Sequence, residues 1–220
     1  MDVHPLDQLL LNMVPSIVAP LNGDFIPLSS NGHRTIVAKQ GLFVELNRPW
    51  LYVRQLIGPN HHIALPYGNL TNEWRLKHLM PKSLFKQFAE HARKSMPHEA
   101  AAWVVFNELT TQYRLVTLDV LSSSGSHITI DRPQMGEGDS LALDLHSHAH
   151  FPAFFSAQDD RDDFGETKLA GVLGHVGSAH ENWCLRLCLL GAFCPWTDFK
   201  RFLIEDSNHE EQMDATGIAA

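Results

Sequence analysis

Residues 141–159 of this 220-residue chain read LALDLHSHAHFPAFFSAQD, and this stretch decides the fold prediction. An apolar run of strand length ends in His146-x-His148, and residues i and i+2 of a strand face the same side of a sheet. Ser156 suits a helix N-cap, and Asp159 lies three positions further on, in the first turn. The stretch therefore predicts a buried strand, a loop and a helix start whose polar side chains converge.

The residue types in this stretch are those of a metal site. Both imidazoles can reach one zinc ion, at about 2.0–2.1 Å each, and Asp159 supplies a carboxylate. Two histidines and one carboxylate leave a fourth position for water, as in catalytic rather than structural zinc sites. His150 faces the same side at i+4, so it stays open as a ligand in place of His148.

Glu99 is the candidate catalytic base. It stands between the end of a predicted helix and the apolar run 100–106. A carboxylate at the mouth of a buried strand can accept a proton from a water molecule that a metal has activated. The rival carboxylates are Glu108, which lies past the strand, and Asp119, which lies inside the next one.

The flanking sequence predicts an α/β (α+β) domain with a mixed sheet between helices. Apolar residues recur at helical spacing after Pro81, and strands are expected at 100–106, 114–121, 127–130, 171–176 and 183–192. Further helices are expected at 156–169 and 198–204. Eight of the twelve prolines lie at or before Pro81, where the chain reads as short extended pieces. We expect a β-rich extension or small domain at 1–80, the main domain at 81–205, and an acidic, flexible tail at 206–220.

Composition narrows the function. The chain carries 17 Lys and Arg against 25 Asp and Glu, for a net charge of −8, which argues against nucleic acid as a partner. No apolar run is long enough to span a bilayer, and the N-terminus does not resemble a signal peptide. Three clustered cysteines make a poor disulfide framework. These features predict a cytoplasmic protein without a membrane partner.

The motif resembles that of the JAMM (MPN-positive) zinc isopeptidases. Their pattern is a glutamate upstream, then His-x-His, then seven residues, then Ser-x-x-Asp, and here it falls on Glu99, His146, His148, Ser156 and Asp159. The local sequence is most similar to JAMM proteins of bacterial PRTRC cassettes. This chain departs from many members by having Ala149 where they have proline, and an Ala-rich run after the glutamate.

The resemblance implies a JAMM/MPN-type fold and one Zn²⁺ held by His146, His148 and Asp159. It also favours His148 over His150 as the second ligand. Glu99 would move the proton from water to the leaving amine, and Ser156 would donate a hydrogen bond to the oxyanion. The substrate would be the tail of a ubiquitin-like protein, with a ThiF-like (E1-like) protein as a possible partner. The alternative function is a non-catalytic MPN scaffold that binds such a partner. An amidohydrolase barrel also uses His-x-His, but it needs about 250 residues.

Neighbouring polar residues have simpler expected roles. Ser147 is expected to be structural rather than nucleophilic. The carboxylates after Asp159 are expected to form a solvated acidic helix start; these are Asp160, Asp162 and Asp163. Cys184 and Cys188 should share one face of a strand with Arg186, as half-buried thiols rather than as a second zinc site.

Overall fold

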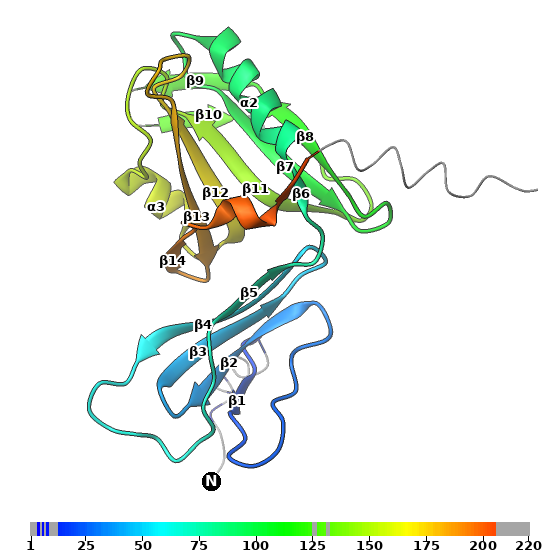
Figure 1. Cartoon of the computed structure of the whole chain (residues 1–220), viewed down its shortest axis with the longest axis vertical. Coiled ribbons are helices and arrows are strands. Elements are labelled where there is room, and N and C mark those ends of the chain that lie inside the picture. The colour runs from blue at the N-terminus through cyan, green and yellow to red at the C-terminus, as the bar shows by residue number, and fades with distance from the viewer. Residues whose placement is uncertain are drawn as a thin grey trace, which may run out of the picture. The chain divides into compact units, whose positions relative to one another are not determined.

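The chain is described by a computed structural model over residues 4, 6, 8, 13–124, 127–130 and 133–205. It divides into two compact units, Met1–His78 and Leu79–Ala220 (Figure 1). The expected boundary at 80/81 lies two residues beyond this division. The acidic tail expected at 206–220 lies outside the described residues. Among the residues that are described, no helix has the length and apolar character needed to cross a membrane.

The first unit is a five-stranded sheet, which confirms the β-rich N-terminal region. Its strands follow chain order: β1 (Ser16–Val18), β2 (Gly32–Ala38), β3 (Gly41–Asn47), β4 (Leu51–Pro59) and β5 (Glu73–Leu76). Only the β1–β2 pair is parallel. Ile36 and Phe43 pack with Ala19, Ala38 and Leu70 in its core, as the alternation of apolar residues requires.

The second unit contains a six-stranded mixed sheet in the order β14-β13-β12-β11-β7-β8. The strands are β7 (Ala101–Asn107), β8 (Gln112–Leu118), β11 (Asp139–Ser147), β12 (Thr167–Gly174), β13 (Asn182–Leu189) and β14 (Ala192–Pro195). β11 pairs in parallel with β12 and antiparallel with β7. The strand that carries the histidines is therefore central and paired on both sides, so its position is fixed by two hydrogen-bond ladders.

Smaller elements complete the second unit. β9 (Val120–Ser124) and β10 (His127–Ile130) form an antiparallel pair. β6 (Met80–Pro81) pairs in parallel with β15 (Leu203–Ile204), which follows a 3₁₀ turn at Phe199–Phe202.

Two α-helices lie in the described part of this unit, and they pack on opposite faces of the sheet. The rings of Phe85 and Phe88 of α2 (Lys82–Ser95) contact the ring of Trp183 of β13, at centroid distances of 5.2 and 5.8 Å respectively. Arg186, three residues along β13, reaches α3 (Ala157–Asp163) instead. Residues an odd number apart on a strand face opposite sides, so α3 lies on the face opposite α2. Arg186 pairs with Ala170 of β12, and Val172, two residues further on, pairs with His146, so the histidines share the face of α3.

The expected mixed sheet with flanking helices is confirmed, whereas several element boundaries were wrong. The helix expected at 156–169 ends at Asp163, because Gly165 adopts φ 85° and stops it. The strand expected at 171–176 therefore starts earlier, at Thr167. The strand expected at 183–192 is interrupted at Leu190 and Gly191, so β13 and β14 are separate. The helix expected at 198–204 is only the 3₁₀ turn followed by β15.

Candidate metal centre

The two histidines lie at the end of β11 with their rings turned toward each other. His146 pairs with Ala101 of β7 and with Val172 of β12, and His148 follows directly after the strand. Their Nε2 atoms are 3.2 Å apart. The i, i+2 spacing on a strand accounts for this placement, as predicted from the sequence.

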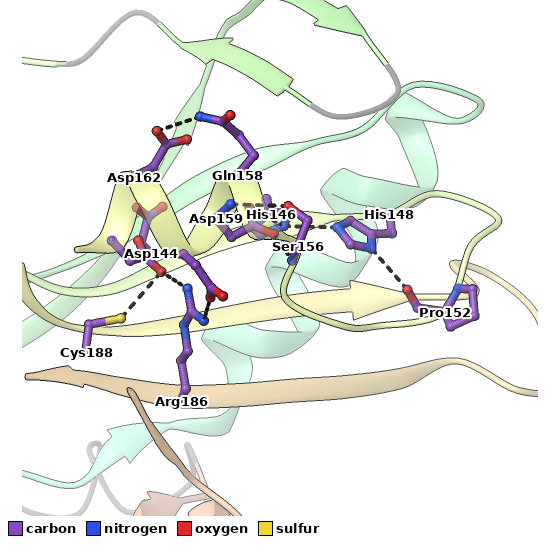
Figure 2. A network of polar contacts seen from close by, with 12 residues as sticks. Asp144, His146, His148, Pro152, Ser156, Gln158, Asp159, Asp162, Arg186 and Cys188 are labelled. Carbon is purple, nitrogen blue, oxygen red and sulfur yellow. Dashed lines mark hydrogen bonds and ion pairs between the residues drawn. The ribbon is translucent and has the colours of Figure 1, made fainter. Parts of the chain in front are cut away.

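The opposite nitrogen of His148 is held by the backbone. Its Nδ1 lies 3.1 Å from the carbonyl oxygen of Pro152 (Figure 2). A carbonyl oxygen only accepts hydrogen bonds, so Nδ1 carries the proton and the Nε2 lone pair faces His146. Metal-binding histidines are typically fixed in this way.

Asp159 uses its two carboxylate oxygens for different contacts. Oδ2 accepts a 2.6 Å hydrogen bond from the backbone N–H of Ser156, and the Ser156 hydroxyl oxygen accepts one from the Asp159 N–H at 3.2 Å. This reciprocal capping box starts α3. Oδ1 is left facing His146, whose Nε2 is 3.5 Å away. The helix cap thus aims one oxygen at the histidines.

Two of the three separations among these side chains match those expected around a single metal ion. His146, His148 and Asp159 each offer one ligand atom, and these atoms lie within 4.8 Å of one another. Two ligand atoms on a tetrahedral zinc, each about 2.0–2.1 Å from it, are separated by roughly 3.3 Å. The 3.2 and 3.5 Å separations observed here match that value, so this group could hold a metal ion.

The loop after His148 is tied to the turn that follows β12. Backbone N–H groups of His148, His175 and Val176 donate across this contact to the carbonyls of Leu173, Phe151 and Ala149. Ala149 adopts φ 46°, which proline cannot reach. This explains why the residue after the second histidine is not proline here. The loop geometry instead depends on backbone pairing with the β12–β13 turn.

Glu99 is brought beside His148 by the pairing of β7 with β11. The ladder continues past His146 and Ala101, because Ser147 N–H donates to the Ala100 carbonyl at 2.9 Å. One residue further along this ladder, His148 lies opposite Glu99. The buried Ser147 hydroxyl also accepts the Ala100 N–H at 2.8 Å. Its predicted structural role is therefore confirmed, and it joins the Glu99 segment to the histidine strand.

The charges at the centre influence one another. Burial lowers the pKa of His146, although Asp159 acts in the opposite direction. A lowered pKa keeps the imidazole neutral, which is the form that binds metals. Burial raises the pKa of Glu99, with His148 opposing this shift and Asp159 reinforcing it. These mutual effects follow from the position of Glu99, which the strand register places next to His148.

The other candidates lie apart from this group. His150 is exposed, and its carbonyl oxygen contacts Nδ1 of His175. Glu108 and Asp119 are also exposed. All three cysteines are free.

One expectation about the acidic helix start was wrong. Asp163 is only 6% exposed and Asp160 is paired with Arg186, so neither is an unpaired surface carboxylate. Asp162 is exposed, as expected. Arg186 was predicted to lie beside the cysteines, but its pairing with these carboxylates was not predicted, and Lys168 was not singled out. A charged residue within an otherwise apolar strand indicates a buried ion pair, but the sequence does not show which carboxylate is the partner.

Comparisons with known proteins give one family match in each of the two units. Residues 81–188 match the family of prokaryotic homologs of the JAB domain. Residues 4–77 match a domain of unknown function, DUF2016. None of the curated proteins compared matches the chain. A solution structure of a protein from Desulfitobacterium hafniense is similar, with 17% identity over 57% of this chain and 90% of that chain and a TM-score of 0.42.

The matched segment 81–188 contains the three possible ligands together with Glu99 and Ser156. It also contains the strands β7, β11 and β12 that position them, and all but the last residue of β13. The match therefore supports the assignment of the second unit to the JAB/MPN family.

Proposed function

We propose that this chain is a zinc-dependent hydrolase of peptide or isopeptide bonds. The observation that carries the proposal is the convergence of His146, His148 and Asp159 within 4.8 Å, with Glu99 next to His148. A JAB domain by itself indicates either a hydrolase or a scaffold. A complete ligand group with a carboxylate beside it favours the hydrolase.

The residues would divide the reaction among them. His146, His148 and Asp159 would hold the zinc, which would polarise the scissile carbonyl and lower the pKa of water toward about 7. Glu99 would take the proton from the water that attacks the carbonyl carbon, and then deliver it to the nitrogen as the C–N bond breaks. The hydroxyl of Ser156 accepts a hydrogen bond within the cap, which leaves its O–H to stabilise the developing oxyanion.

The proposed substrate is the extended C-terminal tail of a ubiquitin-like protein. This choice rests on the resemblance of the motif to JAMM isopeptidases, and a ThiF-like protein is the proposed partner on the same ground. An extended tail can lie beside a sheet edge as an added strand. The same tail could be bound without cleavage by a scaffold, so the experiment must separate binding from hydrolysis.

The test incubates the full, zinc-loaded chain with a ubiquitin-like protein that carries a C-terminal extension. We expect cleavage that a chelator abolishes and that added zinc restores. Zinc content and product are measured on the same sample. A protein that binds one zinc per chain and binds the substrate, yet leaves it intact, would show that the chain is a scaffold.

Variants assign the roles. Ser156→Ala should lower kcat about 10²–10³-fold by removing an oxyanion donor. It should keep its zinc, because Asp159 is held by the backbone N–H of residue 156. His146→Ala should lose both zinc and activity. His150→Ala, an exposed change in the same loop, should keep both.

A further inference from the structure

A network of charges lies under helix α3, on the same face of the sheet as the metal centre, and its two cations and Asp163 are buried. Arg186 of β13, whose side chain is 6% exposed, contacts the carboxylate of Asp160 and donates to Oδ2 of Asp163 at 2.7 Å. Lys168 of β12 bridges Oδ1 of Asp163 at 2.8 Å and Oδ2 of Asp144 at 2.6 Å. Two cations on neighbouring strands thus hold both the helix and β11. Figure 2 shows Arg186 with its dashed contacts.

Arg186 is also fixed by aromatic rings. Its guanidinium carbon lies 3.8 Å from the ring centroid of Phe155 and 4.1 Å from that of Phe193. The guanidinium therefore cannot turn without losing stacking as well as hydrogen bonds.

Three partners of the two cations are close in sequence to residues of the proposed centre. Asp160 follows Asp159, Phe155 precedes Ser156, and Asp144 is two positions before His146 on the same face of β11. The capping box orients Asp159 relative to Ser156, but it does not attach the helix to the sheet. That attachment requires contacts such as those of Arg186 and Lys168.

Helix α3 depends on such contacts because it is only seven residues long. A helix of this length is not stable in water without tertiary packing. Asp163 is its one buried residue, so apolar packing contributes little to holding it. Although burial alone raises the pKa of Asp163, Lys168 and Arg186 bring it below its usual value. The carboxylate therefore stays charged and paired.

We propose that Arg186 and Lys168 are positioning residues of the metal centre, which hold α3 against the sheet so that Asp159 and Ser156 meet the two histidines. This inference rests on the metal site of the proposed function but does not depend on the reaction. Buried ion pairs often add little net stability. A role in fixing the position of α3 explains why five charged side chains, those of the two cations and their three carboxylate partners, meet here.

The test measures Co²⁺ binding and the visible absorption of the Co²⁺ complex, which reports ligand geometry. Hydrogen exchange at the Asp159 amide is measured in the metal-free protein. Arg186→Met removes the pairs with both helix carboxylates, and we expect roughly 10–100-fold weaker Co²⁺ binding, as is typical when partners behind the ligands are lost. The visible band should shift and the Asp159 amide should exchange faster.

A matched pair of helix variants tests the same point more gently. Asp160→Asn removes the negative charge that pairs with Arg186, and Asp162→Asn makes the same change at an exposed position of α3. We expect Asp160→Asn to weaken Co²⁺ binding and Asp162→Asn to match wild type. Arg114→Met, which breaks an ion pair at the far end of β11, should leave Co²⁺ binding unchanged.

Wild-type affinity, absorption and amide exchange in Arg186→Met would overturn the inference. If Arg186→Met does not fold, the comparison of Asp160→Asn with Asp162→Asn decides it, and equal behaviour of these two variants overturns it. If the wild-type protein binds no Co²⁺, the proposed function fails. The exchange rate of the Asp159 amide then still decides whether the network positions the helix.

Discussion

At the scale of single residues, Ser147 joins two parts of the centre that are 47 positions apart in sequence. It stands between the two histidines, and its hydroxyl accepts the backbone N–H that follows Glu99. Neither group is exposed to water, since Ser147 is 0% and Ala100 1% exposed. The hydrogen bond therefore fixes the Glu99 segment at a point where no water can replace the hydroxyl.

Ser147→Ala should lower the free energy of unfolding by about 1–3 kcal/mol. The physical reason is that the Ala100 N–H loses one acceptor in a buried site. Unfolding in denaturant measures this change. Ser140→Ala is the control, because Ser140 lies on the same strand and makes only a 3.4 Å contact to the Phe106 carbonyl. Equal losses in the two variants would contradict the role given to Ser147.

The residues that could be predicted from sequence are those whose partners are local. His146 and His148 share a strand face, and Ser156 and Asp159 share a helix turn, so spacing alone predicts their convergence. The role of Arg186 could not be predicted from local spacing. Its partner Asp163 is 23 positions away, and only the fold shows that a charge inside an apolar strand is satisfied.

At the scale of elements, the loop between β11 and α3 depends on the turn after β12. Gly174 ends β12 against the backbone of this loop: a Cβ added there would lie 2.0 Å from the Ala153 nitrogen and 2.4 Å from the Pro152 carbonyl carbon. The Pro152 carbonyl is also the partner of His148. Because Gly174 has no Cβ, the loop can approach β12 closely, and this places the Pro152 carbonyl against His148.

Gly174→Ala should therefore weaken metal binding by roughly tenfold or more, since the partner of His148 must move. It should also destabilise the protein by about 1–3 kcal/mol, the usual cost of overpacking a tight site. Titration with Co²⁺ and thermal unfolding measure the two effects.

Gly58→Ala is the matched control for this change. Gly58 also lies in a strand, but an added Cβ would have its nearest neighbour at 3.5 Å, an ordinary contact. It should bind Co²⁺ as wild type does. Normal Co²⁺ binding by Gly174→Ala would show that the loop can shift without moving His148.

The start of helix α3 could be predicted from the sequence, but its end could not. Its start was predicted, because Ser156 and Asp159 form a recognisable cap. Its end was placed too late, although Gly165 is a typical helix stop. The acidic run 159–163 suggests a longer exposed helix, whereas Asp163 is buried and β12 begins four residues later.

At the scale of the whole molecule, charge is divided unevenly between the two units. Residues 1–78 carry six Lys and Arg against five Asp and Glu, so of the chain's 17 and 25 the second unit holds 11 and 20. The second unit also contains every residue of the proposed centre and of the network behind it. Each unit has its own buried cluster of apolar residues. Metal binding should therefore be a property of the second unit.

Residues 79–220 alone should fold and bind Co²⁺ with the affinity and visible spectrum of the full chain. The ligands, the loop contacts and the charge network are all contained in this segment. Because the segment is strongly acidic, it will also attract cations without a defined site, so the visible band rather than total bound metal is the measurement. His146→Ala in the same segment is the control and should abolish the band. A folded segment that lacks the band, while the full chain has it, would show that residues 1–78 are required to complete the centre.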